Sequence, residues 1–380
     1  MESNHNNDWT AAELVYRGEG NSSIVIAVKK VCFDQFRKVK LFRKHKSLPD
    51  EDTFALLMPD FCDIPQTIAT NDNLIGPVIS VEIKPKQGFL SSLDPYSCVY
   101  SSFQSVKLEQ GLITRKSGYC PLDLYSGCRH RMNIALNQLL SNPQNNFRIF
   151  RDLQLAYGEG LKCDIDTILH GFINVTETIG SIKDVFCNLL IEALLKPFHN
   201  KNEILYSKLK MKYEQHYCNY HRDISLPCEC KEKCQLPYDC ILGTILRTQM
   251  LDTIDHRFAQ DLLDFILKCS SDIEKFSELT VPRGVGSISK LDFESNELFM
   301  TRKIWEFLVS LTAKDCSIII AMQKLNSAEI EFNSDTEDAV TIIHVPQARS
   351  RFFVRLSIID VDQKPFHKVY KLKNFKNIKI

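Results

Sequence analysis

The chain has 380 residues, enough for two or three domains. Hydrophobic residues make up 44% and charged residues 25%, as in an ordinary globular protein, and a formal net charge of zero argues against a generic nucleic-acid binder. The polar N-terminus has no apolar signal segment, and no apolar run approaches the ~20 residues of a membrane span. We therefore expect an intracellular protein without membrane or nucleic-acid partners, whose 14 cysteines are mostly reduced.

Basic residues crowd two segments of this neutral chain, one near each end. Such local clusters suit a compact anionic ligand better than a long duplex. The clusters consist of Lys29, Lys30, Arg37, Lys38, Lys40, Arg43, Lys44 and Lys46, and of Lys364, Lys368, Lys371, Lys373, Lys376 and Lys379.

The first ninety residues are expected to be rich in strands. Residues 1–10 read as a disordered tail, and residues 21–36 read as a hairpin preceded by the glycine-containing segment "RGEGN" at 17–21. Residues 54–61 and 78–84 are predicted to form further strands.

After residue 90 the apolar period becomes helical. Helices are expected around 132–140, around 182–193 with an end at Pro197, and around 304–311. Strand character returns at 316–323 and 351–360. The predicted fold class is α+β, with a small β-rich lobe over residues 11–90 and a larger, mostly helical lobe over residues 91–380 that contains a late hairpin.

The stretch "SVEIKPKQGFL" at 80–90 carries an unusual charge pattern. Glu82, Lys84 and Lys86 occupy alternate positions, so they share one strand face, opposite the apolar residues at 79, 81 and 83. Two interpretations stay open from the spacing alone: a solvated strand face, or a row of charges directed at a phosphate or a metal.

The late hairpin is expected to bring two acidic residues together. Asp315 precedes the first of its strands and Asp360 ends the second, so antiparallel pairing makes them neighbours. Two close carboxylates favour a cation such as Mg²⁺, and one of them could take a proton from an attacking hydroxyl. The alternative is that both are ordinary turn residues.

These parts together match the needs of phosphoryl transfer. The glycine segment could cover phosphates with backbone N–H groups, although such a short segment is more often a plain turn. A glycine loop, a connector near 57–61, a lysine-bearing strand and a hairpin with two acids resemble the components of a two-lobed kinase.

Six stretches closely resemble the inositol-pentakisphosphate 2-kinase family and follow its order. They are "YRGEGNSSIVIA" (16–27), "VEIKPKQGF" (81–89), "YCPLDLYSGCRHRM" (119–132), "NPQNNFRIF" (142–150), "LTAKDCSIIIA" (311–321) and "IIDVDQKP" (358–365). The resemblance implies a kinase-like two-lobed fold that uses ATP and Mg²⁺ to phosphorylate the 2-hydroxyl of inositol pentakisphosphate, giving inositol hexakisphosphate (phytate). It also implies a small-molecule substrate, a monomer, and a place in cytoplasm and nucleus.

The resemblance assigns roles residue by residue. Asp315 matches the family's base and Lys84 the lysine that stabilises the transferring phosphate; Asp360 matches the metal-binding aspartate, with Asp315 beside it. The positions that match nucleotide contacts are Gly18, Glu19, Gly20, Asn21, Arg37, Met58, Asp60 and Asp360. The positions that match inositol phosphate contacts are Lys84, Lys86, Arg129, Lys364, Lys368 and Tyr370.

The chain departs from the family pattern in its N-terminal part. Family members have several tens of residues more between the glycine loop and "EIKPK", including a substrate-gripping arginine that has no match here. The loop after Lys364 is also shorter, which weakens the matches of Lys368 and Tyr370. An alternative reading is therefore an impaired short form that binds inositol phosphates without turnover.

Two further signals are weaker. The segment 216–240 is dense in cysteine and histidine, which suggests a structural zinc or a reduced surface insertion. Its members are His216, Cys218, His221, Cys228, Cys230, Cys234 and Cys240. Glu82 and Lys84 also form the short E-x-K pattern of metal-dependent nucleases, with Asp60 upstream, but no DNA-binding motif accompanies it.

Overall fold

The computed structural model describes the greater part of the chain. The described residues are 14–19, 24–28, 60–64, 73–90, 98–161, 163–174, 180–197, 234–251, 254, 256–269, 296–326, 340–362 and 364. The chain divides into two compact units, Met1–Phe61 and Cys62–Ile380. Within the described part, no helix is both long and apolar enough to cross a membrane.

The first unit contains a two-stranded antiparallel sheet. Strand β1 (Leu14–Glu19) pairs with β2 (Ile24–Val28), with an irregularity between Tyr16 and Gly18. Of the hairpin expected within 21–36, the described residues contain one strand, β2, which pairs with the earlier strand β1, and residues 29–36 lie outside the description. The segment "RGE", expected to precede the hairpin, is part of β1. Most of the strand expected at 54–61 lies outside the described residues, and Asp60 and Phe61 at its end are not in a strand.

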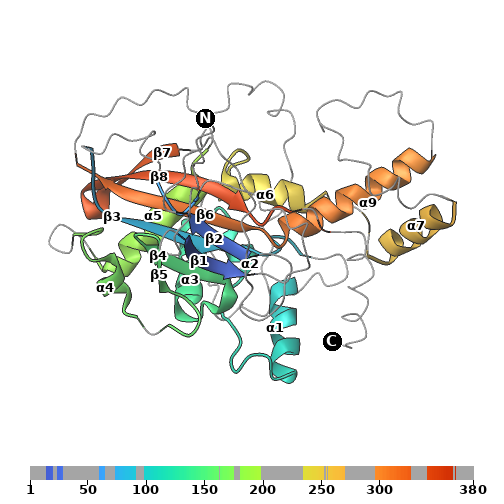
Figure 1. The fold of residues 1–380 in the computed structure, drawn as a ribbon, viewed down its shortest axis with the longest axis horizontal. Coiled ribbons are helices and arrows are strands. Elements are labelled where there is room, and N and C mark those ends of the chain that lie inside the picture. The colour runs from blue at the N-terminus through green and yellow to red at the C-terminus, as the bar shows by residue number, and fades with distance from the viewer. Residues whose placement is uncertain are drawn as a thin grey trace, which may run out of the picture. The chain divides into compact units, whose positions relative to one another are not determined.

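The second unit is built on a six-stranded antiparallel sheet (Figure 1). Its order is β5-β4-β3-β6-β8-β7, so β3 and β6 are central. The strands are β3 (Leu74–Ile83), β4 (Phe147–Arg151), β5 (Gln154–Tyr157), β6 (Ser317–Leu325), β7 (Val340–Val345) and β8 (Ser350–Ile359). Strand β3, which the sequence analysis assigns to the N-terminal lobe, therefore pairs with strands of the second unit.

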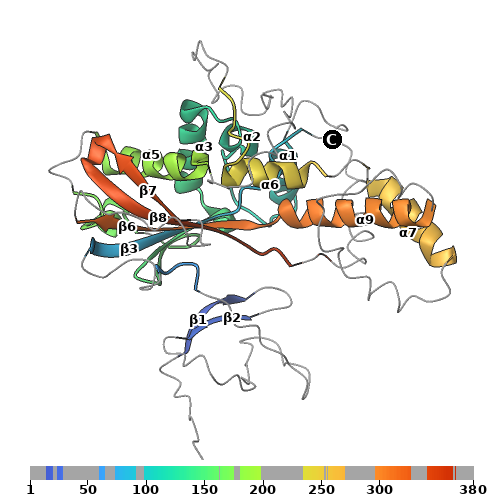
Figure 2. The same ribbon diagram turned by 90° about the horizontal axis from the view of Figure 1, so that it is seen from above.

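Helices α2, α3, α5 and α6 lie on one face of this sheet (Figure 2). The helices of the unit are α1 (Val99–Glu109), α2 (Pro121–Leu124), α3 (Arg129–Ser141), α4 (Ile165–Leu169), α5 (Ile182–Leu195), α6 (Ile241–Gln249), α7 (His256–Cys269) and α9 (Asn296–Ala313). The helical periods expected around 132–140, 182–193 and 304–311 correspond to α3, α5 and α9, so these predictions are confirmed.

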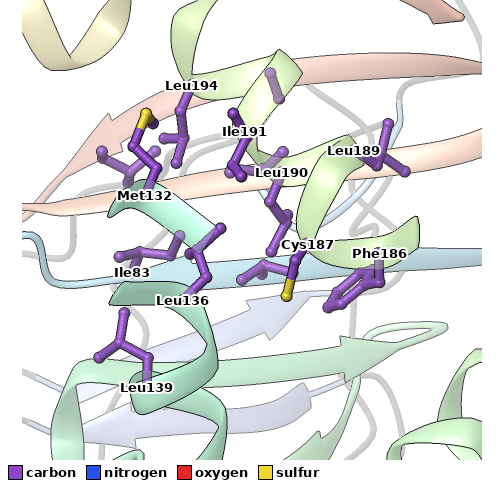
Figure 3. Packing of buried hydrophobic residues seen from close by; sticks show 14 of the residues in the cluster. Ile83, Met132, Leu136, Leu139, Phe186, Cys187, Leu189, Leu190, Ile191 and Leu194 are labelled. Atoms are coloured by element: carbon purple, nitrogen blue, oxygen red, sulfur yellow. The ribbon is translucent and has the colours of Figure 1, made fainter. Parts of the chain in front are cut away.

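The core lies between the sheet and these helices. On β3, alternation directs Ile79, Val81 and Ile83 into the main apolar cluster. Figure 3 shows how α3 and α5 cover this face, with labelled side chains Ile83, Met132, Leu136, Leu139, Phe186, Cys187, Leu189, Leu190, Ile191 and Leu194. Helix α5 begins at the N-cap Ser181, whose Oγ accepts a hydrogen bond from the Asp184 N–H, and ends before Pro197. The helix-covered face therefore holds the main core, and Glu82 lies on the other face, which carries a smaller buried cluster of Ile64, Ala321, Leu325 and Phe353.

Strands β6 and β8 pair antiparallel, as expected for the late hairpin. Their register sets Ser317 opposite Ile359. The sequence analysis did not anticipate β7, which intervenes in the chain and then pairs with the outer side of β8. It also did not anticipate β4 and β5, which extend the sheet on the side of β3.

Candidate functional site

The register of the sheet gathers the predicted residues at one end. Ile83 at the end of β3 lies opposite Ile318 of β6 and Phe147 of β4, and Ser317 lies opposite Ile359 at the end of β8. The residues that follow β3, precede β6 and follow β8 must therefore meet there. This is how Lys84, Asp315 and Asp360 come together, although they are far apart in the chain.

A polar row crosses four neighbouring strands at this end of the sheet. Arg148 of β4 contacts Glu82 of β3, with Nη1 and Oε2 3.0 Å apart. The Ser317 hydroxyl of β6 lies 3.1 Å from Glu82 Oε1 and 2.8 Å from Asp360 Oδ2. Lys84 Nζ lies 3.1 Å from the same Asp360 oxygen. Glu82 is only 8% exposed, so the interpretation of its strand face as solvated is wrong for this residue.

Asp315 is held by two lysines. It lies in the turn after α9, where its N–H donates to the Thr312 carbonyl oxygen. Its Oδ1 is 3.4 Å from Lys86 Nζ and its Oδ2 is 3.0 Å from Lys364 Nζ. Asp315 thus bridges Lys86, in the segment after β3, and Lys364, in the segment after β8.

These contacts shift two pKa values. Burial alone would raise the pKa of the Asp315 carboxyl, but the ammonium groups of Lys86 and Lys364 outweigh it and hold this pKa below its ordinary value. Burial lowers the pKa of Lys86, and the attraction of Asp315 offsets only part of that effect. Asp315 is therefore an ionised acceptor at neutral pH.

Two site residues have left-handed backbone conformations. Lys86 has φ of 60° and Asp360 has φ of 59°, a region that non-glycine residues rarely adopt. Such strain persists only where neighbouring contacts hold it, and it is common at functional sites. Lys86 lies three residues after β3, Asp360 directly follows β8, and both carry a charge of the cluster.

Arg129 is engaged elsewhere. It begins α3, and its guanidinium forms a two-pronged ion pair with the Glu192 carboxylate of α5. The hydrogen bonds to this carboxylate raise the pKa of Arg129. Within the described part of the chain, Arg129 is thus paired with Glu192 and makes no ion pair with the lysine and aspartate cluster.

Apart from Asp360, the predicted nucleotide residues belong to the first unit, and several of them lie outside the described residues. Gly18 and Glu19 end β1, where they pair with Val25 and Ile24 of β2. Asp60 also belongs to the first unit. Gly20, Asn21, Arg37, Met58, Lys368 and Tyr370 lie outside the described residues. Their predicted roles remain predictions.

The donor set at the sheet end fits Mg²⁺ better than zinc. Mg²⁺ is held in proteins by one or two carboxylates together with waters and substrate phosphates, and Asp315 and Asp360 supply two carboxylates. A preformed group of three or more His, Cys, Asp or Glu side chains that could hold a metal is absent from the described part of the chain. A magnesium ion here would thus depend on phosphate oxygens for its remaining ligands.

The zinc expected at 216–240 has no support in the structure. Residues 216–233 lie outside the described residues. Cys240 is used otherwise: its Sγ accepts the Gly243 N–H as the N-cap of α6, donates to the Pro237 carbonyl oxygen, and burial raises its pKa to about 11.

Sequence reasoning missed three residues that organise the site. Ser317 and Arg148 flank Glu82, and Gln249 at the end of α6 donates to the Lys86 carbonyl oxygen, 2.8 Å away. Ser317 lies two residues after "AKD" (313–315) in the stretch "LTAKDCSIIIA", and Arg148 lies in "NPQNNFRIF", so both belong to stretches that carry the family resemblance. No local pattern distinguishes Gln249, because its contacts come from segments more than sixty residues away.

The arrangement can bind an anion and accept a proton in the same place. Three ammonium groups surround two carboxylates at one sheet end, where backbone register holds them. Phosphate oxygens would pair with the lysines, and a hydroxyl brought to Asp315 would find an ionised acceptor.

Comparison with known proteins points the same way. A model of the inositol-pentakisphosphate 2-kinase family matches residues 36–376. The chain is 26% identical over 366 residues to the Danio rerio inositol-pentakisphosphate 2-kinase, and this alignment covers 84% of this chain and 70% of that protein. It is 28% identical over 316 residues to an inositol-pentakisphosphate 2-kinase from Oryza sativa subsp. indica, and this alignment covers 77% of this chain and 57% of that protein. For the Arabidopsis thaliana protein of that description the identity is 25% over 342 residues, with 84% and 62% covered. The chain thus spans less than two thirds of the plant relatives' length.

Proposed function

Because the chain belongs to the inositol-pentakisphosphate 2-kinase family, we propose that it transfers the γ-phosphate of ATP to the 2-hydroxyl of inositol 1,3,4,5,6-pentakisphosphate. The product would be inositol hexakisphosphate. The proposal includes a kinase-like division into a nucleotide lobe over residues 11–90, with a connector near 57–61, and a substrate lobe over residues 91–380, to whose sheet β3 of the first range contributes a central strand. Family membership also displaces the nuclease alternative, which rested on the short E-x-K pattern alone.

One observation carries this proposal: the cluster of Lys84, Lys86 and Lys364 around Asp315 and Asp360. A substrate with five phosphates carries roughly −8 to −10 charges near pH 7 and requires a dense basic lining. Three lysines at one sheet end supply part of that lining. Arg129, Lys368 and Tyr370 are proposed to extend it.

Asp315 is proposed as the general base. Its carboxylate accepts hydrogen bonds from two lysines whose ammonium groups are also suited to phosphate oxygens, so a substrate held by Lys86 and Lys364 would lie against Asp315. Position matters more than basicity here, because phosphoryl transfer depends chiefly on alignment and charge stabilisation. The proton of the 2-hydroxyl would pass to an Asp315 oxygen.

Lys84 and Asp360 are proposed to act on the transferring phosphate. Lys84 Nζ is a point charge held by Asp360, and Ser317 fixes the orientation of the Asp360 carboxylate. Mg²⁺ bound with ATP at Asp360 would neutralise charge on the phosphates, a role that the two aspartates are chemically fit to support. Gly18, Glu19, Gly20, Asn21, Arg37, Met58 and Asp60 are proposed to hold the nucleotide.

The decisive experiment is phosphate transfer from ATP and Mg²⁺ to inositol pentakisphosphate, with products separated by anion-exchange chromatography. The purified 380-residue chain is expected to make the hexakisphosphate. Asp315→Asn is expected to lower kcat by about 10²–10⁴-fold and Lys84→Ala by about 10²–10³-fold. Lys303→Ala, which removes a lysine of α9 paired with Glu306, is the matched control and should leave kcat unchanged.

Two results would change the proposal. Full activity in Asp315→Asn or Lys84→Ala would refute the site assignment. A folded wild-type chain that binds inositol pentakisphosphate without turnover would instead favour the binding-only alternative, whose motive is the short segment between the glycine loop and "EIKPK".

A further inference from the structure

A buried glutamine, Gln249, binds the backbone near Lys86 and the backbone near Asp315, the two residues of one ion pair. Gln249 is the last residue of α6 and is fully buried. Its Nε2 lies 2.8 Å from the Lys86 carbonyl oxygen and 3.1 Å from the Ala313 carbonyl oxygen. Its Oε1 accepts the Gly88 N–H at 2.9 Å. One amide therefore binds the segment after β3 and the last residue of α9.

These three contacts use the amide almost completely. A glutamine side chain has two N–H donors and one carbonyl acceptor group, and the two shortest donor contacts go to backbone carbonyl groups. The Tyr125 hydroxyl lies farther away, at 3.3 Å from Nε2. Because backbone positions are bound on both sides, the amide fixes the main chain and not merely a neighbouring side chain.

The glutamine is itself anchored. The Ser310 hydroxyl of α9 donates to the Gln249 carbonyl oxygen at 2.6 Å. On the other side of the lysine segment, the Tyr119 hydroxyl donates to the Pro85 carbonyl oxygen at 2.7 Å. The segment that carries the left-handed Lys86 is thus held from α6 and from the segment before α2.

We propose that Gln249 is a positioning residue, which sets the distance between the Lys86 ammonium and the Asp315 carboxylate by binding the backbones on which both are carried. The inference rests on the proposed function for its catalytic consequence, since Lys86 is the proposed substrate contact and Asp315 the proposed base. Ala313 lies two residues before Asp315, and Gly88 lies two residues after Lys86, so loss of the amide would release both segments. An error of about 1 Å in such an alignment lowers a rate by about 10²-fold.

The test compares Gln249→Met and Gln249→Asn with the control Gln104→Met. Methionine keeps the volume and removes every hydrogen bond, whereas asparagine keeps the amide on a side chain one methylene shorter. Gln104 is a matched glutamine: it is 1% exposed, accepts from the Ser117 N–H and exchanges hydrogen bonds with Gln144. Thermal unfolding identifies which variants fold.

Kinetics distinguish positioning from plain loss of stability. Unfolding of a fraction of the protein lowers kcat alone, because the molecules that remain folded bind normally. Mispositioning of Lys86 and Asp315 should raise KM for inositol pentakisphosphate about tenfold and lower kcat about tenfold, with KM for ATP within twofold of wild type. We expect this pattern in both Gln249 variants and not in Gln104→Met. Unchanged KM for the inositol substrate in both, or equal changes in Gln104→Met, would overturn the inference.

A second readout is independent of activity. Hydrogen exchange of the Gly88 amide should accelerate at least tenfold in the Gln249 variants, since this N–H loses its acceptor, and should not change in Gln104→Met. If the wild-type chain transfers no phosphate, the proposed function fails, and Gly88 exchange decides the inference: protection that persists in the Gln249 variants refutes it, and lost protection supports it.

Discussion

Replacement of Ser317 by alanine tests the polar row that crosses the sheet end. The hydroxyl is fully buried and lies between two carboxylates, 2.8 Å from Asp360 Oδ2 and 3.1 Å from Glu82 Oε1. It has one hydrogen, so it donates to only one of them at a time. In Ser317→Ala both carboxylates lose this donor, although Lys84 still contacts Asp360 and Arg148 still contacts Glu82.

The expected loss is about 2 kcal/mol in the free energy of unfolding. A hydrogen bond to a charged group contributes about 1.5–3 kcal/mol, and the lower half applies because Asp360 is partly exposed and keeps Lys84. For a unit that spans Cys62–Ile380 the loss corresponds to a fall in Tm of about 3 °C. Ser350→Ala is the control, because the buried Ser350 hydroxyl donates only to the neutral Ala348 carbonyl oxygen and its loss should cost about 1 kcal/mol.

Urea unfolding of both variants measures the difference, and a double-mutant cycle identifies its cause. With glutamine at position 82, the hydroxyl donates to Asp360 without a competing carboxylate and its Oγ can accept from the glutamine amide, so the penalty of Ser317→Ala should grow by about 1 kcal/mol in that background. The reasoning is refuted if Ser317→Ala is no more destabilising than Ser350→Ala, or if the penalty is the same with Gln at position 82.

Three further predictions concern pH, substrate affinity and packing. Burial raises the pKa of the Cys187 thiol to about 12, so above pH 9 the folded chain keeps a proton that the unfolded chain releases. The free energy of unfolding should therefore fall by about 1 kcal/mol between pH 8 and pH 10 because of this thiol. Urea unfolding of Cys187→Ala should show a pH dependence that is smaller by this amount. Arg129→Ala should weaken inositol pentakisphosphate binding about tenfold in calorimetry, because it removes a positive charge from the proposed lining. The Tm should not change, because the ion pair of Arg129 with Glu192 is largely exposed. Unchanged affinity would remove Arg129 from the proposed lining. Gly88→Ala should lower the free energy of unfolding by about 2–3 kcal/mol, because a Cβ at this position overlaps the Tyr125 ring. The control Gly111→Ala should lower it by only about 1 kcal/mol, because a Cβ there meets open space and only the left-handed backbone opposes it. Equal losses in the two variants would contradict the predicted overlap.

Local patterns were sufficient to predict the centre of the site. Alternation along β3 places Glu82 opposite the apolar side chains at 79, 81 and 83, and antiparallel pairing of the two late strands makes neighbours of Asp315 and Asp360. Both inferences depend only on the period of a strand and on the tendency of strands close in the chain to pair. They hold even though β7 intervenes between β6 and β8, because β7 adds to the outer side of β8 and leaves the inner pairing intact.

Contacts that depend on distant segments could not be predicted in the same way. Gln249 and Lys86 are separated by 163 positions, and neither the helical period of α6 nor the "EIKPK" stretch indicates that they meet. The ion pair of Arg129 with Glu192 likewise depends on how α3 packs against α5. The segment "RGE" was misassigned for a different reason: its glycine is typical of a turn, but the irregularity between Tyr16 and Gly18 accommodates that glycine within β1.

The same device is used twice at the sheet end. Lys86 follows β3 and Asp360 follows β8, and each has a left-handed backbone that costs a non-glycine residue about 1–2 kcal/mol. In each case a buried polar side chain from another element holds the strained residue: Gln249 binds the Lys86 carbonyl oxygen, and Ser317 binds the Asp360 carboxylate. A left-handed residue within three positions of the strand end places its charged side chain against a partner from a different segment. The register of the sheet sets which residues meet, and the two buried anchors keep the left-handed residues where their charges pair with Asp315 and Lys84.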